Sequence, residues 1–270
     1  MTSTSPDKPL RRISARPRLL SVRVIMALML REMTATYGRS PGGYIWAILE
    51  PVLGIAFISY IFSLGFRTPR LGTNFPIFFA TGMLPYQMTL QLSNNAAGAI
   101  NYSRSLLAYP RVTYFDAIAA RILLAVLTNM LVSTIVFFGI TLAWDTRTVF
   151  EIDRAIMTVL MVVSFGVSLG LLNSVPITMF PLYRSAWSIL TRPLLFLSGV
   201  IFLYESMPRI AQNILWYNPL QHITGELRGA FYLQYEAKYV SPLYVFSVSI
   251  ILAVSGLVLL HRYHRDMLER

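Results

Sequence analysis

Residues 117–143 read AIAARILLAVLTNMLVSTIVFFGITLA and contain a single charged side chain, Arg121. The hydrocarbon core of a bilayer is about 30 Å thick, and a helix needs about 20 mostly apolar residues to cross it. A strand of a membrane barrel would instead alternate apolar and polar residues over about 10 positions. Because a backbone in lipid must satisfy its own hydrogen bonds, this run predicts a transmembrane helix.

Five further apolar runs are separated by short polar segments: residues 44–66, 75–95, 155–178, 186–204 and 243–261. The whole chain is 55% hydrophobic and 13% charged, whereas soluble domains carry about 25% charged residues. We therefore expect an all-α integral membrane protein in which six transmembrane helices form one domain over residues 44–262. Cysteine is absent, which excludes disulfides and thiolate metal ligands.

The segment before the first predicted span is too charged to cross a membrane. Residues 18–37, RLLSVRVIMALMLREMTATY, mix aliphatic side chains with Arg23, Arg31 and Glu32. This pattern is typical of an amphipathic helix that lies along the membrane interface, and we expect one over residues 18–40. Such a helix fits a membrane anchor and a surface on which a cytoplasmic partner acts equally well.

The basic residues indicate on which side of the membrane each part of the chain lies. Of the 23 lysines and arginines, 16 fall in the terminal segments and in the predicted loops on the same side as those segments. The positive-inside rule then places both termini in the cytoplasm, with a basic tail at residues 1–17 and a short tail at residues 263–270. The formal net charge of +11 follows these segments rather than a folded basic domain, so we do not expect nucleic-acid binding. The polar first 20 residues lack the apolar core of a cleavable signal.

Four sequence blocks carry a resemblance to known permeases: LREMTATYGRSPGGYIWAILEP (residues 30–51), FPIFFATGMLPY (75–86), YPRVTYFDAIAAR (109–121) and LWYNPLQHITGELRGA (215–230). Together with the basic tail after His261, they resemble the permease subunits of ABC-2 polysaccharide exporters, in particular capsular polysaccharide export permeases of the KpsM type. The resemblance implies a homodimer that associates with two copies of a separate ABC ATPase subunit in the bacterial inner membrane. The implied substrate is a lipid-linked capsular polysaccharide, and the implied further partners are periplasmic and outer-membrane export proteins.

The chain has no phosphate-binding loop of the P-loop type. That loop needs a lysine after a glycine-rich turn, and the only lysines are Lys8, which follows Asp7, and Lys238, which follows Ala237. We therefore expect a transporter subunit rather than an enzyme, without a cofactor of its own and with ATP and Mg²⁺ bound by the partner ATPase. The alternatives are an ABC-2 permease for O-antigen, lipid or drug, and a gradient-driven secondary transporter. A gradient-driven transporter commonly places acidic residues within its spans, but such residues are scarce here, Glu50 being the clearest, and the spans show no convincing proton relay.

The predicted loop between the second and third spans, residues 101–116, lies on the cytoplasmic side. In ABC-2 permeases this region includes the helix that couples to the ATPase, so the resemblance makes the loop a docking segment. An ordinary positive-inside loop is the alternative. The predicted coupling residues lie in this loop and in the interfacial helix: Arg31, Glu32, Arg104, Tyr109, Arg111 and Asp116.

Two charges lie at matching depth inside predicted spans. Glu50 and Arg192 are each about six residues from the cytoplasmic boundary, or roughly 9 Å at about 1.5 Å per residue. Because unpaired charges at membrane depth are costly, we predict that the two pair across the channel entrance, or that Arg192 meets an anionic group of the substrate. Snorkelling of each side chain to the interface and pairing of Glu50 with Arg121 are the alternatives.

Aromatic side chains extend the predicted translocation path, because ring faces stack on sugars and still allow a polymer to slide. The predicted path residues are Glu50, Phe57, Tyr60, Tyr86, Arg192 and Tyr204. An aromatic belt at the membrane interface is the alternative for any one of these rings.

Between residues 204 and 239, Pro208 and Pro219 divide the chain into two helices that are too short to span. We expect re-entrant or interfacial helices here, and with them an external gate. The predicted gate residues are Trp216, Tyr217, Asn218, Pro219, His222 and Glu226. His222 and Glu226 lie on one helix face, but this single pair lacks the further groups of a catalytic or metal site. We therefore expect a structural hydrogen bond rather than a membrane enzyme.

Small residues predict close helix packing in the fourth span. Gly166 and Gly170 form a G-x-x-x-G pattern, with Ser164 and Ser168 beside them. This pattern lets two helices approach closely, and we expect it to be used within the bundle.

Overall fold

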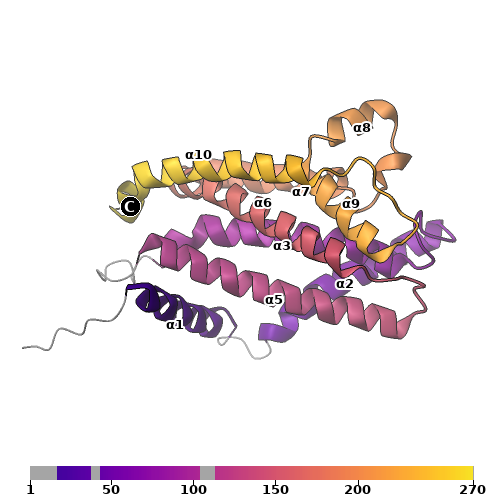
Figure 1. Ribbon diagram of the computed structural model, residues 1–270, viewed down its shortest axis with the longest axis horizontal. Coiled ribbons are helices and arrows are strands. Elements are labelled where there is room, and N and C mark those ends of the chain that lie inside the picture. Colours follow the sequence, from indigo (N-terminus) through magenta and orange to yellow (C-terminus); the bar gives the residue numbers. More distant parts are fainter. Residues whose placement is uncertain (1–16, 38–42, 104–112, 270) are drawn as a thin grey trace, which may run out of the picture.

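The computed structural model describes residues 17–37, 43–103 and 113–269 (Figure 1). All regular secondary structure in these ranges is helical. The elements are α1 (Pro17–Tyr37), α2 (Gly43–Gly65), α3 (Phe75–Tyr102), α5 (Tyr114–Ala143), α6 (Ile152–Met179), α7 (Pro181–Leu197), the 3-10 helix η1 (Tyr204–Ser206), α8 (Arg209–Leu215), α9 (Pro219–Phe231) and α10 (Pro242–Glu269). The long helices form one elongated bundle (Figure 1).

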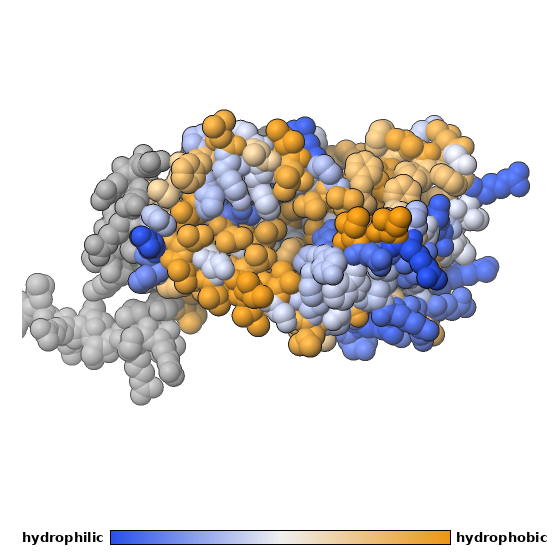
Figure 2. Space-filling model, turned by 90° about the horizontal axis from the view of Figure 1, so that it is seen from above, coloured by the Kyte–Doolittle hydropathy of each residue, from blue (hydrophilic) through white to orange (hydrophobic). Residues whose placement is uncertain are grey.

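Four helical segments among the described residues are long and apolar enough to cross a membrane: Ile45–Gly65, Tyr114–Ala143, Ile152–Met179 and Pro242–Tyr263. Figure 2 shows broad apolar areas over the middle of the molecule and hydrophilic residues gathered at its right-hand end. Large apolar side chains such as Leu142 and Leu182 are highly exposed. Their exposure suits a surface that faces lipid rather than water. The prediction of an all-α membrane protein is confirmed, with four of the six predicted spans recognised by length and apolarity.

The helix at the centre of the bundle is α3, which packs against α2, α5, α6 and α9. Most of its residues are buried, and they include polar side chains such as Thr81, Thr89 and Ser93. Small and hydroxyl-bearing residues are common where helices pack against each other in membranes. The position of α3 inside the bundle therefore accounts for its lower apolarity.

Close packing of α6 on α3 depends on glycine. A Cβ atom added to Gly166 would lie 2.9 Å from the carbonyl oxygen of Thr89 and 3.0 Å from Cβ of Leu92. A Cβ atom added to Gly170 would lie 2.6 Å from Cβ of Ala96. The G-x-x-x-G pattern is therefore used within the bundle, as predicted.

Several helix boundaries differ from the limits of the predicted spans, and those of α7 and α3 matter most for the packing of the bundle. The helix in the predicted fifth span, α7, ends at Leu197 instead of continuing to residue 204. Gly199 has a φ of 71°, a left-handed conformation that glycine adopts readily and that turns the chain away from the helix. In contrast, α3 continues to Tyr102, beyond the predicted end of its span at residue 95.

The bundle has two different ends (Figure 1). At one end, α1 packs against α5, and α10 ends at the same end of the bundle; we call this the α1 end. The opposite end carries α8, α9 and the connections before α3 and α6; we call it the α9 end. At the α1 end, α5 begins with a capping box in which Asp116 N donates to Thr113 Oγ1 (3.2 Å) and Thr113 N donates to Asp116 Oδ2 (3.1 Å).

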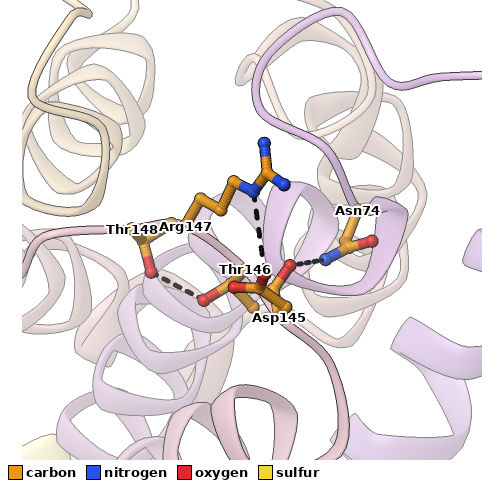
Figure 3. Close-up of polar contacts among 5 residues, drawn as sticks. All are labelled: Asn74, Asp145, Thr146, Arg147 and Thr148. Atoms are coloured by element: carbon orange, nitrogen blue, oxygen red, sulfur yellow. Dashed lines mark hydrogen bonds and ion pairs between the residues drawn. The ribbon is translucent and has the colours of Figure 1, made fainter.

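At the α9 end, the connection after α5 is fastened to the residue that precedes α3 (Figure 3). The Nδ2 group of Asn74 donates to the carbonyl oxygen of Asp145 (2.7 Å), and Arg147 Nε lies 3.6 Å from Asp145 Oδ2. The hydroxyls of Thr146 and Thr148 are 2.9 Å apart. Arg147 has a φ of 48°, so this turn holds a side chain in the left-handed region, where non-glycine residues are uncommon.

Candidate functional site

The shorter helix α9 is inserted at the α9 end against α3, α6 and α10. It begins where expected: Pro219 lies in the first turn, and the side chain of Asn218 accepts a hydrogen bond from Leu220 N (3.1 Å). Residues 220–231 are all buried except Glu226, which is partly exposed. A helix with several polar side chains therefore lies inside the protein rather than on its surface.

Arg228 is fully buried in α9, with 0% of its surface exposed. Its Nη2 donates to the carbonyl oxygen of Val200 (3.2 Å) and its Nη1 to that of Phe202 (3.4 Å), while its guanidinium carbon lies 4.5 Å from the ring centroid of Phe78. None of the described carboxylates forms an ion pair with it. The absent side chain of Gly82 leaves room for this contact, because a Cβ atom there would lie 2.8 Å from Cα of Val200.

Tyrosines surround the region next to Arg228. The hydroxyl of Tyr235 donates to both carboxylate oxygens of Glu205, at 3.0 and 3.1 Å. The ring of Tyr204 stacks on that of Tyr239 with 4.0 Å between centroids, and its hydroxyl donates to the carbonyl oxygen of Gln212 (3.0 Å). Tyr204 was predicted to line the translocation path. In the structure it packs among the tyrosines and short helices of the α9 end.

His222 is held by backbone groups on both sides of its ring. Nδ1 accepts a hydrogen bond from Ser241 N (3.1 Å), which leaves Nε2 as the donor to the carbonyl oxygen of Trp216 (2.7 Å). Burial lowers the pKa of His222 below its ordinary value, and the backbone hydrogen bonds oppose that effect. The ring is therefore neutral and structural, and its partners are backbone groups rather than Glu226.

Glu226 faces the start of α6. Burial raises the pKa of its carboxyl, and the nearby Arg154 opposes that rise. Glu151 N donates to the carbonyl oxygen of Ala230 (2.8 Å), and this hydrogen bond ties the start of α6 to α9. Within the start of α6, Arg154 Nε lies 2.8 Å from Glu151 Oε2. Within the described ranges, no group of three or more His, Asp and Glu side chains could hold a metal ion.

The other predicted gate residues connect α9 with the helices on either side of it. The indole Nε1 of Trp216 donates to the carbonyl oxygen of Tyr239 (3.3 Å), and Tyr244, at the start of α10, donates to that of Tyr217 (2.8 Å). Asn218 Nδ2 donates to the carbonyl oxygen of Leu197, the last residue of α7 (3.0 Å). The predicted gate segment therefore joins the ends of α7 and α10.

A second polar cluster lies at the α1 end. Glu32 of α1 is 8% exposed, and its Oε1 lies 3.1 Å from Nε of Arg121 on α5. The guanidinium carbon of Arg121 also lies 4.4 Å from the ring centroid of Tyr102, the last residue of α3. Burial raises the pKa of Glu32, and the positive charges of Arg121 and Arg31 oppose that rise.

The predicted coupling residues fall into three groups. Arg104, Tyr109 and Arg111 lie outside the described residues. Arg31 is exposed on α1, whereas Glu32 is buried against α5. The Asp116 carboxylate is engaged in the cap of α5, so this residue fixes where α5 begins.

The predicted path residues lie mainly on exposed faces of α2 and α7. Phe57 and Tyr60 are 66% and 65% exposed, and Glu50 and Arg192 are exposed as well. No ion pair joins Glu50 to Arg192 within this chain. Tyr86 differs, because it is 7% exposed and its hydroxyl donates to the carbonyl oxygen of Thr191 on α7 (3.0 Å).

A comparison with protein families matches residues 23–232 to the ABC-2 type transporter family. This match runs from within α1 to just beyond the end of α9 and includes Arg228, His222 and the Glu32–Arg121 pair. The chain belongs to the ABC-2 type transporter family.

Named relatives of this ABC-2 transporter match it over nearly all of their length. The polysialic acid transport protein KpsM of Escherichia coli is 30% identical over 247 residues, which cover 90% of this chain and 95% of the relative. The capsule polysaccharide export inner-membrane protein CtrC of Neisseria meningitidis serogroup A is 27% identical over 250 residues, covering 92% and 94%. The capsule polysaccharide export inner-membrane protein BexB of Haemophilus influenzae is 29% identical over 250 residues, covering 91% and 92%.

Two features of this transporter were missed in the sequence. The sequence does not single out Arg228, because its helix also carries Gln221, His222 and Glu226, and hydropathy therefore gives no sign that this segment is buried. The Glu32–Arg121 pair was missed because the two residues are far apart in the sequence and Arg121 was considered only as a partner for Glu50. Pairing across helices depends on their relative rotation, which hydropathy does not report.

Proposed function

We propose that this chain is the membrane permease subunit of an ATP-driven exporter that moves a lipid-linked capsular polysaccharide across the bacterial inner membrane. Two copies form the transmembrane path, and two separate ABC ATPase subunits supply the energy. The single observation that carries this proposal is the similarity to three named capsule or polysialic acid transport proteins over at least nine-tenths of each chain. The two lysines of the sequence, neither of which follows a glycine-rich turn, support an ATPase on a separate subunit.

The proposed topology has six spans, with α3 and α7 added to the four apolar segments. A central helix can be less apolar than a lipid-facing one, as α3 is. At 17 residues, α7 is about 26 Å long, close to the thickness of the hydrocarbon core. The α1 end is cytoplasmic because 16 of the 23 basic residues lie in segments assigned to that side. The α9 end then faces the periplasm, where periplasmic and outer-membrane export proteins would receive the polymer.

In this proposal, α8 and α9 are re-entrant helices that form the external gate. The buried polar side chains of α9 support this role, since non-helical backbone and polar groups at membrane depth need protein partners. The exposed faces of α2 and α7 line the path between the two copies, with Glu50, Phe57, Tyr60 and Arg192 on them. Tyr86 acts from behind α7 through its hydrogen bond to Thr191.

The proposed docking site for the ATPase is the segment between α3 and α5. Its coupling residues Arg104, Tyr109 and Arg111 are followed by the capping box of Thr113 and Asp116, which fixes the first turn of α5. Charge reversal at Arg104 and Arg111 should abolish co-purification of the ATPase. Full retention of the complex in that double variant would count against the docking site.

The test of the proposed function is co-expression with candidate ABC ATPases, followed by pull-down and ATPase assays in lipid. A stable complex with polysaccharide-responsive hydrolysis is the expected result. Absence of a complex with any such ATPase would overturn the proposal and leave a gradient-driven transporter as the next candidate. An ATPase complex that responds to a drug, a lipid or O-antigen instead would retain the exporter and replace its substrate.

A further inference from the structure

The contact between α1 and α5 contains an ion pair with little exposure to solvent. The side chains of Glu32 and Arg121 are 10% and 15% exposed, and Nε of the arginine lies 3.1 Å from Oε1 of the glutamate. Removing two charges from water is costly, and each charge at this site therefore depends on the other. By contrast, the pair of Asp145 and Arg147 at the α9 end is 80% and 77% exposed and depends little on its partner.

Arg121 makes a second contact through the same guanidinium. The group lies over the ring of Tyr102, 4.4 Å from its centroid, at the end of α3. One turn earlier on α3, Gly98 lies beside the same side chain, since a Cβ atom there would be in ordinary contact with Nη1 at 3.5 Å. A single side chain of α5 therefore touches both α1 and the end of α3.

These contacts lie between the proposed ATPase docking segment and the helices that lead to the proposed path. Tyr102 immediately precedes the proposed ATPase docking segment, and α5 begins immediately after it, at Tyr114. Glu32 lies near the end of α1, which precedes α2 in the chain and contacts it. The exposed face of α2 carries Tyr60 and Glu50 of the proposed path. A displacement of the docking segment can thus reach α2 through Arg121 and Glu32.

We propose that Glu32 and Arg121, with the ring of Tyr102, are positioning residues that transmit movement from the ATPase docking segment to α1 and then to α2. This inference rests on the proposed function, because it names the residues through which ATP hydrolysis in the partner would open the path. Both side chains are largely buried between α1 and α5, so in this proposal they have no direct contact with substrate or ATPase. Its loss should therefore separate hydrolysis from export while leaving the complex assembled.

The experiment uses the full-length permease co-expressed with its ATPase. Glu32→Gln and Arg121→Gln should each retain the complex and its ATP hydrolysis but lower polysaccharide export about tenfold. Loss of a charged hydrogen bond changes the equilibrium that depends on it by about tenfold or more. The exchange Glu32→Arg with Arg121→Glu should recover most of the export. Asp145→Asn, which breaks the exposed pair, is the matched control and should export normally. Normal export in both single variants, or an exchange no better than either, would overturn the inference.

A second measurement does not depend on transport. The chain has no cysteine, so Ile25→Cys on α1 and Ile122→Cys on α5, which line one apolar groove, can report the contact by crosslinking. Glu32→Gln should lower the crosslinking yield, and an unchanged yield would overturn the link. If the unaltered permease binds no ATPase, the proposed function fails, yet the crosslinking still decides whether the pair holds α1 on α5.

If the charge variants fail to accumulate in the membrane, Tyr102→Leu still tests the proposed link between α3 and α5. Leucine retains an apolar side chain at the end of α3 but removes the ring beneath the guanidinium. Lower export with an intact ATPase complex is expected. Normal export would remove Tyr102 from the link.

Discussion

The guanidinium of Arg228 donates from Nη2 to the carbonyl oxygen of Val200 across 3.2 Å, between residues that are 28 positions apart in the sequence. Val200 lies in the turn that follows α7, so this bond ties that turn to α9. The cation has no carboxylate partner among the described residues, and its stabilisation depends on carbonyl oxygens and on the ring of Phe78. Such a contact stabilises one arrangement of the α9 end at the expense of burying a charge.

Truncation of this arginine should therefore destabilise the protein. Arg228→Ala leaves two buried carbonyl groups without their donor and opens a cavity, and we expect a loss of about 3–5 kcal/mol in the free energy of unfolding. Arg228→Met should cost less, because both variants remove the buried charge but methionine fills most of the space that alanine leaves empty. Thermal unfolding in lipid or detergent measures both, with the exposed Arg209→Ala as the control. Equal melting of Arg228→Ala and the unaltered protein would contradict this role.

Gly170 offers a test of the packing between α6 and α3. Gly170→Ala places a methyl group 2.6 Å from Cβ of Ala96, so the two helices must separate, and we expect a cost of about 1–3 kcal/mol. Gly139→Ala on α5 is the matched control, because nothing lies within 4 Å of the added atom. That control should be neutral or stabilising by up to about 1 kcal/mol, since alanine favours helices over glycine. A Gly170→Ala variant as stable as Gly139→Ala would show that α6 does not pack on α3 in this way.

The buried ring of His222 predicts a dependence of stability on pH. Its pKa in the folded protein is lowered from 6.5, mainly by burial, so the unfolded chain binds a proton more readily than the folded one. The stability that this residue contributes is therefore present above about pH 6.5 and is lost as the pH falls toward the folded pKa. Protonation of Nδ1 would also end its acceptance of the Ser241 N–H group.

Melting temperatures measured from about pH 7.5 down to about pH 5 should show this effect. The unaltered protein should lose more stability over that range than His222→Gln, because glutamine does not titrate. The absolute stability of the variant is not the readout; the difference in slope is. Parallel curves would mean that His222 has the same pKa in the folded and unfolded states.

The helices followed closely from the sequence because they depend on local features. The predicted run at residues 117–143 became α5, Tyr114–Ala143, and Pro208 and Pro219 mark the starts of α8 and α9 as expected. Hydropathy and proline positions report which segments are helical and where they break. They do not report how the helices are rotated about their axes.

The polar contacts depended on that rotation and were predicted poorly. His222 and Glu226 were expected to share a helix face, and they do, but their partners come from other segments: Ser241 and Trp216 for the histidine, and Arg154 for the glutamate. The depth expected for Glu50 says nothing about which way its side chain faces, and no ion pair of the described residues includes it. Depth also could not reveal that Arg121, at similar depth, would face Glu32 of α1 instead.

Because Glu50 and Arg192 do not pair within one chain, we predict that Glu50 of one copy pairs with Arg192 of the other. Both side chains are exposed on one copy, where no ion pair joins them. In the proposed homodimer, exposed faces of α2 and α7 meet at the path, and an unpaired charge there would remain costly. Glu50→Gln and Arg192→Gln should therefore each lower export, and the exchange Glu50→Arg with Arg192→Glu should restore part of it.

Crosslinking can test whether positions 50 and 192 of the two copies lie close together, without a measurement of transport. Glu50→Cys combined with Arg192→Cys should give a disulfide-linked dimer under oxidation, because disulfides form only when the two Cα atoms lie within about 7 Å. Glu50→Cys with Arg184→Cys, about two turns away on α7, is the matched control and should give much less dimer. A dimer yield no higher than that of the control, together with normal export by both glutamine variants, would remove this pair from the path and leave each charge to the membrane interface.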